Sequence, residues 1–258
     1  MIYFIFPVYN EKDNLPKLVA SIRRMMAGKD YRMVAVNDGS TDGSVELLGE
    51  LKQDDLTVIG SVINMNVGAV FSAGIAEVLR EAQEDDVVLI MESDQTSEID
   101  LVLPMTEKIL KEGQDIVIAS RYLTGGKYQN FPFPRLVFSH CANRLMRAFF
   151  PVCRVRDYTI FFRAYRAGVL RQAASYFGLF GLIQSKGFVA NAELLIKLSF
   201  FTDKIIEVPF IYNYGKKKGA SKIQVLSTIN EYFVLINYLK EIFTKRAKLE
   251  KTAVKGGA

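Results

Sequence analysis

The chain has 258 residues, of which 50% are hydrophobic and 24% are charged, and its formal net charge is +5. This length and this balance predict one folded domain with a large core, and they exclude an intrinsically disordered chain. Two cysteines, Cys141 and Cys153, are too few to hold a chain of this size by disulfides or to form a cysteine metal cluster, and they indicate a reducing compartment.

Short apolar runs alternate with amphipathic stretches in the first half of the chain. Parallel strands need long crossover connections, usually helices, so this alternation predicts βαβ units in an α/β fold. We expect a mostly parallel central sheet flanked by helices, with ligands bound beyond the carboxyl ends of its strands. The predicted strands are 2–6, 31–36, 57–63, 87–91 and 115–119, and the predicted helices are 13–27, 42–53, 68–83 and 99–112.

The second half of the chain is less regular. We expect one α/β domain over residues 1–220, which includes an amphipathic helix near 134–150. An amphipathic helix over 221–248 and a disordered tail over 249–258 complete the predicted organisation. The predicted helices of this half are 134–150, 166–175, 190–200 and a final one from about 222 to 246, and the predicted strands are 158–165 and 205–210.

Polar and acidic residues follow three of the predicted strands and should meet at one edge of the sheet. These segments are 7–11, 37–42 and 92–96. In the last of them, Glu92 and Asp94 are two residues apart, so their side chains point to the same side of an extended segment. Such hard oxygen ligands favour Mg²⁺ or Mn²⁺, although an acidic pair after a strand is also typical of a solvated loop.

The turn after the second strand has residues that suit a ligand-binding turn. Asp38 is followed by Gly39, which allows the backbone to approach a ligand, and Ser40 or Thr41 can cap the next helix. On its own, the segment is better explained as an ordinary strand-to-helix turn.

Taken together and in order, these segments resemble the family 2 glycosyltransferases, and among them most closely the polyprenol-phosphate sugar synthases. The resemblance extends from Pro7 to about Lys240. It implies that residues 1–220 form a catalytic domain and that a nucleotide-sugar donor binds to it. The nucleotide contacts implied by the match are Pro7, Tyr9, Glu11, Val36, which would line the base pocket, and Asp38.

Three positions depart from the family pattern at this site. The Asp-x-Asp metal motif of the family is Glu92-Ser93-Asp94 here, which keeps the charge but lengthens one arm. The match assigns Glu92 and Asp94 to the metal and Ser93 to the nucleotide, and it makes Asp94 catalytic. Thr96 stands where some relatives have a third ligand near the metal, so Mg²⁺ and Mn²⁺ both remain open. One acid of the nucleotide turn is replaced by Asn37.

Further motifs match family segments near the diphosphate and the acceptor. Lys216 takes the place of an arginine, and the match implies that it binds the diphosphate or the acceptor phosphate together with Lys222. A solvated basic loop is the alternative for these two lysines. The matching segments are 120–122 with Arg121, 157–159 with Asp157, 162–166, 186–188 with the later Glu193, 207–209 and 219–222.

The reaction implied by the resemblance is the transfer of a hexose, with inversion, from a GDP- or UDP-sugar to a polyprenyl phosphate. A lipid phosphate is already anionic near neutral pH, so it needs no general base, and Arg121 and Lys222 would hold the nucleophile in line. A sugar hydroxyl acceptor would need a base, for which Asp157 is the candidate, although it can equally be a turn residue or an ion-pair partner of Arg163. A nucleotide-binding regulator without activity and a peripheral membrane scaffold are the remaining hypotheses.

Basic residues crowd the last fifth of the chain, and two stretches, 135–150 and 225–243, have the spacing of amphipathic helices. Core-packing helices have the same spacing, but the resemblance implies helices at a membrane interface, and basic flanks suit an anionic lipid surface. No stretch approaches the ~18 to 20 apolar residues of a spanning helix. We therefore expect a cytoplasmic protein that binds the membrane peripherally or through a separate membrane subunit, with no nucleic-acid partner.

Overall fold

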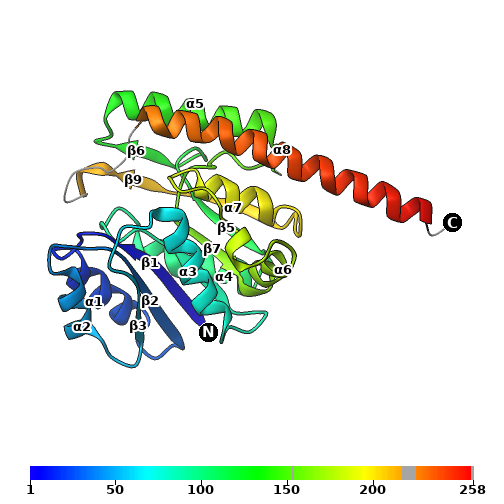
Figure 1. Cartoon of the computed structure of the whole chain (residues 1–258). Helices are drawn as coiled ribbons and strands as arrows, with labels where there is room; N and C mark the ends of the chain where they lie inside the picture. Colours follow the sequence, from blue (N-terminus) through cyan, green and yellow to red (C-terminus); the bar gives the residue numbers. More distant parts are fainter. Residues whose placement is uncertain (153, 217–224, 257–258) are drawn as a thin grey trace.

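A seven-stranded sheet forms the centre of the computed structural model, which describes residues 1–152, 154–216 and 225–256. The strands are β1 (Ile2–Val8), β2 (Tyr31–Asp38), β3 (Leu56–Ser61), β4 (Val87–Ile90), β5 (Ile116–Ser120), β7 (Arg163–Arg166) and β8 (Ile205–Pro209). Their order is β3-β2-β1-β4-β7-β5-β8, and only β7 runs antiparallel to its neighbours among these described strands (Figure 1). The predicted α/β fold with a mostly parallel sheet is confirmed.

Helices connect the strands and flank the sheet. The longer helices are α1 (Leu15–Met25), α2 (Ser44–Leu51), α3 (Val67–Leu79), α4 (Val102–Leu110), α5 (Phe133–Phe149), α6 (Ala167–Phe177), α7 (Ala190–Leu198) and α8 (Val225–Gly256). Short 3₁₀ turns are η1 (Ile99–Leu101), η2 (Leu179–Gly181) and η3 (Tyr214–Lys216). Figure 1 shows α5 and α8 side by side, next to a small parallel ribbon of β6 (Lys127–Gln129) and β9 (Ile211–Asn213).

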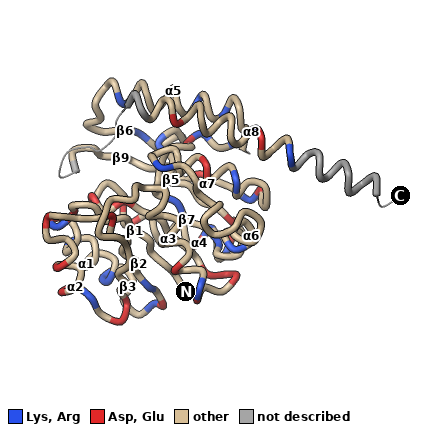
Figure 2. The backbone as a smooth tube through the Cα atoms, in the orientation of Figure 1, with Lys and Arg blue, Asp and Glu red and all other residues tan. Residues whose placement is uncertain are grey.

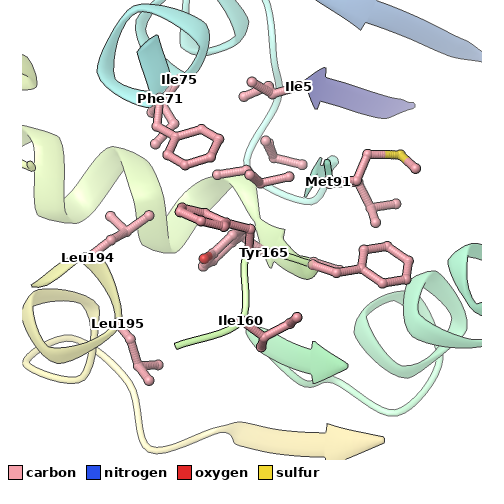
Figure 3. Packing of buried hydrophobic residues seen from close by; sticks show 14 of the residues in the cluster. Ile5, Phe71, Ile75, Met91, Ile160, Tyr165, Leu194 and Leu195 are labelled. Carbon is pink, nitrogen blue, oxygen red and sulfur yellow. The ribbon is translucent and has the colours of Figure 1, made fainter. Parts of the chain in front are cut away.

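The hydrophobic core lies between the sheet and its helices. All four residues of β4, Val87–Ile90, are apolar and buried. An unbroken apolar sequence is expected for a central strand that is covered on both faces. Figure 3 shows Tyr165 of β7 between Phe71 of α3 and Leu195 of α7, so helices from both halves of the chain pack into one core. Burying each side chain of this size contributes about 1.5 to 3 kcal/mol.

One predicted strand is shorter than expected. The segment 158–165 becomes a strand only at β7, because side chains bind the backbone amides that precede it. The amide of Tyr158 donates to Asn143 Oδ1 at 2.6 Å, and the amide of Thr159 donates to Asp157 Oδ1 at 3.2 Å. These amides are therefore not available to a neighbouring strand. The strands β6 and β9, of three residues each, were not predicted because so short a run has no readable alternation.

The last helix is longer than predicted. α8 continues to Gly256, past the predicted end near 246 and through most of the segment 249–258 that we predicted as a disordered tail. Neither proline nor glycine occurs between Val225 and Gly256, so the sequence contains no strong signal to end the helix earlier. The division of the chain into a domain, a helix and a tail stays a prediction.

Candidate active site

A cavity of about 360 Å³ opens at the carboxyl edge of the sheet. The residues after β1, the last residue of β2 and the residues after β4 line it on one side, and α5 and α8 contribute Phe138 and Tyr232 on another. This is the edge where parallel α/β sheets bind their ligands. Of the predicted site residues, the cavity brings together Pro7, Tyr9, Glu11, Asp38, Glu92, Ser93, Asp94 and Arg121.

After β4, the carboxylates of Glu92 and Asp94 both lie close to the hydroxyl of one buried threonine, Thr96. The hydroxyl of Thr96 lies 2.5 Å from Asp94 Oδ1 and 3.2 Å from Glu92 Oε2, so both carboxylates lie next to the same oxygen. The hydroxyl of Ser93, between them in sequence, donates to the carbonyl of Pro7 at 2.5 Å and fixes the segment to β1. Gln95 has a φ of 67°, which makes the sharp turn that returns Thr96 to the pair.

These residues fit a divalent cation such as Mg²⁺ or Mn²⁺. Two carboxylates and a hydroxyl are oxygen donors of the kind that such ions prefer, and Mg²⁺ commonly binds through one or two carboxylates plus the phosphates of its substrate. No group of three or more acidic, histidine or cysteine residues suited to a metal occurs in the described part of the chain. Glu92, Asp94 and Thr96 would hold such an ion, with its remaining ligands supplied by phosphate oxygens or water.

Tyr212 of β9 is a cavity residue that the sequence analysis missed. Burial, and next the negative charges of Glu92 and Asp94, raise the pKa of its phenol, so the hydroxyl stays protonated and can donate a hydrogen bond. The three-residue strand that carries Tyr212 has no sequence signal that places it beside the acidic pair.

The turn after β2 places Asp38 at the cavity. The backbone amides of Met65 and Asn66 donate to Asp38 Oδ1 at 2.6 and 3.2 Å, which ties the turn to the loop before α3. Gly39 has a φ of 72°, and a Cβ atom there would lie 2.6 Å from backbone atoms of Ile63 and Asn64. Glycine is therefore required both for the left-handed conformation and for the close approach.

The hydrogen bonds of Asn37 explain why an amide, and not a carboxylate, occupies this position. Its Nδ2 donates to the carbonyl of Ser61 at 2.7 Å, and its Oδ1 accepts from the amide of Ser40 at 3.1 Å. A carboxylate could accept the second bond but not donate the first. The asparagine thus joins β3 to the turn, and Asp38 is the acid that the turn places in the cavity wall.

Ser40 and Thr41 do not cap α2, contrary to the sequence expectation. The helix begins after Gly43 without a side-chain cap. Instead, the Ser40 hydroxyl accepts from the amide of Asn10 at 3.1 Å, and the Thr41 amide donates to Asn10 Oδ1 at 2.8 Å. The turn is therefore fastened to the loop after β1 that carries Tyr9.

Val36 lies in the core, not in the cavity. Its side chain is fully buried, and its Cγ2 would lie 3.2 Å from a Cβ atom built at Gly74 of α3. The prediction that Val36 lines a base pocket is therefore not met by its position. In a strand, alternate side chains face opposite sides of the sheet, and Val36 faces the helix.

Arg121 and Asp157 form a buried ion pair at the cavity wall. Nε and Nη2 of Arg121 donate to Oδ2 and Oδ1 of Asp157 at 2.7 and 2.6 Å. Burial opposes both charges, but the attraction outweighs it: the pKa of Asp157 lies below its ordinary value and the pKa of Arg121 well above its own. Both groups stay charged, with Arg121 lining the cavity and Asp157 fully buried.

Arg163 is not the ion-pair partner of Asp157 that the sequence analysis considered. Its guanidinium donates to the backbone carbonyls of Asn191, Tyr158 and Asp157 at 2.7, 2.9 and 3.3 Å. A carboxylate that is already bonded to Arg121 and has a lowered pKa is a weak proton acceptor, which disfavours the alternative of Asp157 as a general base.

Glu193 stabilises the loop that contains Lys186, a residue of the cavity wall. The carboxylate of Glu193 accepts from the amides of Gln184 and Ser185, the latter at 2.7 Å, and pairs with Lys197. Lys197 also donates to the hydroxyl of Tyr238 on α8 at 3.2 Å. The matched Glu193 is therefore a supporting residue of the loop, and its spacing from Lys197, one helical turn, is the sequence signal for the pair.

Two predicted phosphate ligands cannot be placed. Lys222 lies outside the described residues, and Lys216 is described only as the last residue of η3, without its side chain. Their roles stay predictions. Lys186 and Arg135 are two other basic residues that do line the cavity, and Arg135 donates to the hydroxyl of Tyr214 at 3.2 Å.

The fold and the cavity define an α/β protein with a candidate ligand site at the carboxyl edge of its sheet, lined by the acidic pair and by a buried arginine. Residues 3–174 match the model of the family described as glycosyl transferase family 2, and the chain belongs to this family.

Two relatives with assigned names extend this likeness. The chain is 32% identical to the dolichol-phosphate mannosyltransferase of Pyrococcus furiosus over 88% of its own length and 60% of that protein. It is 30% identical to the polyprenol monophosphomannose synthase of Mycolicibacterium smegmatis over 85% of its own length and 79% of that protein. The chain thus spans somewhat over half of the first relative's length.

A solved structure supports the fold. Glucosyl-3-phosphoglycerate synthase from Mycobacterium tuberculosis, in complex with Mn²⁺, UDP and glucosyl-3-phosphoglycerate, is similar with a TM-score of 0.63. The match covers 93% of this chain and 78% of that one at 17% sequence identity, so it concerns the fold alone.

Proposed function

We propose that the chain is an inverting glycosyltransferase that moves a hexose from a nucleotide diphosphate sugar to a polyprenyl phosphate. The observation that carries this proposal is one cavity with an acidic oxygen cluster, Glu92 and Asp94, and a buried arginine, Arg121. The names of the two relatives favour mannose as the sugar and a polyprenyl phosphate as the acceptor.

The donor would bind along the carboxyl edge of the sheet. Tyr9, Glu11 and Asp38 would contact the nucleoside, since all three line the cavity at the ends of β1 and β2. Glu92 and Asp94, with Thr96 between them, would hold Mg²⁺ or Mn²⁺, and the ion would neutralise the leaving diphosphate. Mn²⁺ accompanies UDP in the mycobacterial structure of similar fold.

The acceptor chemistry needs no general base in this chain. A lipid phosphate is anionic near neutral pH, so one of its oxygens can attack the anomeric carbon directly as the sugar–diphosphate bond breaks on the opposite face. Arg121, held by Asp157, would orient that phosphate and offset its charge. A sugar hydroxyl acceptor is less well supported because Asp157 is committed to Arg121.

We further propose that α5 and α8 lie at the cytoplasmic surface of an anionic membrane. Both helices expose large apolar side chains, including Phe133 at 73% and Phe233 at 54%. Figure 2 shows basic residues along the same two helices, and Arg144 and Lys245 are exposed there. In the described residues, no helix is both long and apolar enough to cross a bilayer. Apolar and basic side chains on one pair of helices suit an interfacial position.

The test is transfer of radiolabelled sugar from a panel of GDP- and UDP-sugars to a short-chain polyprenyl phosphate, with Mn²⁺, with Mg²⁺ and with EDTA. We expect labelled lipid that requires a divalent ion and is lost in Asp94→Ala. Asp100→Ala, at an exposed position of η1, is the matched control and should retain transfer. Nucleotide binding without transfer from any donor would contradict the proposal and favour an inactive regulator.

A further inference from the structure

Asn143, in the middle of α5, is buried behind the cavity wall. It is 3% exposed and does not line the cavity. Its Nδ2 lies 2.8 Å from the carbonyl oxygen of Ser139, one turn earlier on α5, and 3.1 Å from the hydroxyl oxygens of both Thr159 and Tyr122, so three acceptors share its two hydrogens. Its Oδ1 accepts from the amide of Tyr158 at 2.6 Å. One side chain thus joins α5 to the segment after Asp157 and to the residue after Arg121.

The hydroxyl of Thr159 connects Asn143 to the arginine. Nη2 of Arg121 donates to Thr159 Oγ1 at 2.6 Å, and Thr159 Oγ1 also lies 3.3 Å from Asp157 Oδ1. The path from α5 to Arg121 is therefore two hydrogen bonds long. Because this region is buried, a displacement of Asn143 leaves polar groups unpaired and cannot be compensated freely by water.

A second contact from α5 reaches the same arginine from another side. Ser139 Oγ lies 2.7 Å from the hydroxyl of Tyr128 and 2.9 Å from that of Tyr122. The Arg121 guanidinium carbon lies 5.0 Å from the centre of the Tyr128 ring. Ser139 and Asn143 are four residues apart and share one face of the helix, so α5 presents a polar inner face to the surroundings of Arg121.

The same helix also exposes apolar side chains, next to basic ones such as Arg144. Phe133, Val137 and Phe149 are exposed by 73%, 45% and 42%. Since a helix moves as one body, a shift imposed on its outer face also shifts Ser139 and Asn143.

We propose that Asn143 is a positioning residue that couples the seating of α5 on a lipid surface to the orientation of Arg121. This inference rests on the proposed function for the identity of the acceptor and of the surface. Arg121 adopts its productive orientation when α5 is seated, so transfer to the lipid phosphate is faster at a membrane surface. Asp38 and the acidic pair hold the nucleotide from other elements, and nucleotide affinity does not depend on Asn143.

The experiment compares the full wild-type chain with Asn143→Leu and Asn143→Asp. The first removes all bonds of the amide, and the second keeps an acceptor for the Tyr158 amide but removes the donor to Thr159. Nucleotide affinity is measured with GDP and UDP, and transfer to a short-chain polyprenyl phosphate is measured with and without vesicles of phosphatidylcholine and phosphatidylglycerol.

For the wild type we expect a higher kcat when vesicles are present. Both variants should lose this stimulation and about tenfold to a hundredfold in kcat, because a misplacement of about 1 Å can cost about a hundredfold. Nucleotide affinity should stay within about twofold of the wild type, well under the tenfold that about 1.4 kcal/mol produces. Vesicle stimulation that persists in both variants would overturn the inference, as would a wild type without stimulation.

Met146→Ala is the control for a merely structural effect. Met146 is fully buried on α5, and its apolar side chain makes no hydrogen bond that could reach Arg121. Met146→Ala should lower the melting temperature as much as Asn143→Leu and still be stimulated by vesicles. This result would show that the hydrogen bonds of Asn143 couple α5 to Arg121. Equal loss of stimulation in both would assign Asn143 a structural role only.

A double-mutant cycle with Thr159→Val tests the route. If Asn143 acts through Thr159, the combined loss in kcat should be smaller than the product of the single losses, whereas independent effects would multiply and contradict the route. A wild type that binds nucleotide but transfers no sugar to the lipid would instead contradict the proposed function, and with it the inference.

Discussion

Asp157 carries a buried negative charge whose partner, Arg121, faces the cavity. Asp157→Asn would keep the shape but leave the guanidinium without its counter-charge, which costs about 3 to 5 kcal/mol for a buried pair. We expect a large loss of stability in urea unfolding and a loss of sugar transfer at every pH, as a positioning role requires.

Asp115→Asn is the matched control for that change. Asp115 pairs with Arg166 at 2.9 Å, and neither residue lines the cavity. It should lower stability to a smaller extent and leave transfer intact. Full activity of Asp157→Asn would show that Arg121 does not depend on this carboxylate.

Glu231 of α8 should make stability depend on pH. Its Oε2 is buried and has no hydrogen-bond partner within the described residues, and burial raises the pKa of the carboxyl above its ordinary value of 4.5. The folded state then holds its proton more tightly than the unfolded state, so stability falls as the pH rises from 4.5 through the raised pKa.

The variant Glu231→Gln removes this titration. It should melt at a higher temperature than the wild type near neutral pH, and the difference should shrink as the pH falls below about 4, where the wild-type carboxyl is protonated in both states. Thermal melts across this range provide the measurement. A difference that does not change with pH would mean that the charge of Glu231 is not what destabilises the fold.

The close contact between α3 and the loop after η2 can be tested at Gly68. A Cβ atom at this position would lie 1.9 Å from the carbonyl oxygen of Ser185. Gly68→Ala should therefore push the loop away, displace Lys186 at the cavity and weaken both stability and donor binding. Chemical unfolding and nucleotide titration would measure the two effects.

Gly49 of α2 offers the opposite case. A Cβ atom there would meet nothing within 4 Å, and the residue is inside a helix. Gly49→Ala should stabilise the protein by about 0.5 to 1 kcal/mol, since alanine loses less backbone entropy on folding. If Gly68→Ala and Gly49→Ala changed the free energy of unfolding in the same direction and by a similar amount, the close contact at Gly68 would not determine the stability of the variant.

The elements of the first half could be predicted because their pattern is local. Buried strands such as β4 have unbroken apolar sequences. The polar residues that follow such strands, for example Asp38 and Asp94, lie at the same edge of the sheet because parallel strands end there. The resemblance added which of these residues bind the nucleotide and the metal.

The rest of the site depends on contacts that no local pattern shows. Asp157 was considered as a base or as a partner of Arg163, and only the packing of β5 against the segment before β7 brings it to Arg121. Tyr212 lines the same cavity as the acidic pair, but it lies on a strand of only three residues. Val36 is buried in the core because its side chain is on the face of β2 that packs against a helix.

For the whole molecule, the pair α5 and α8 should be the surface that binds lipid. Phe133→Ser combined with Phe233→Ser removes two exposed apolar side chains from this pair. We expect weaker sedimentation with vesicles of phosphatidylcholine and phosphatidylglycerol, with nucleotide binding unchanged, because apolar area no longer enters the interface.

Val45→Ser is the control for lipid binding. Val45 is 43% exposed on α2, which Figure 1 shows far from α5 and α8. The substitution should leave vesicle binding unchanged. Equal binding by the double variant and the wild type would place the lipid surface elsewhere on the molecule.

In the proposed reaction, a lipid phosphate that is oriented by Arg121 is the nucleophile. The most direct measurement compares sugar transfer to a polyprenyl phosphate with transfer to the free polyprenol of the same length, using the donor that binds best. We predict labelled product from the phosphate alone, and its loss in Arg121→Ala. Labelled product from the alcohol at a similar rate would contradict this role of the lipid phosphate, because a hydroxyl acceptor needs a general base that Asp157, paired with Arg121, does not provide.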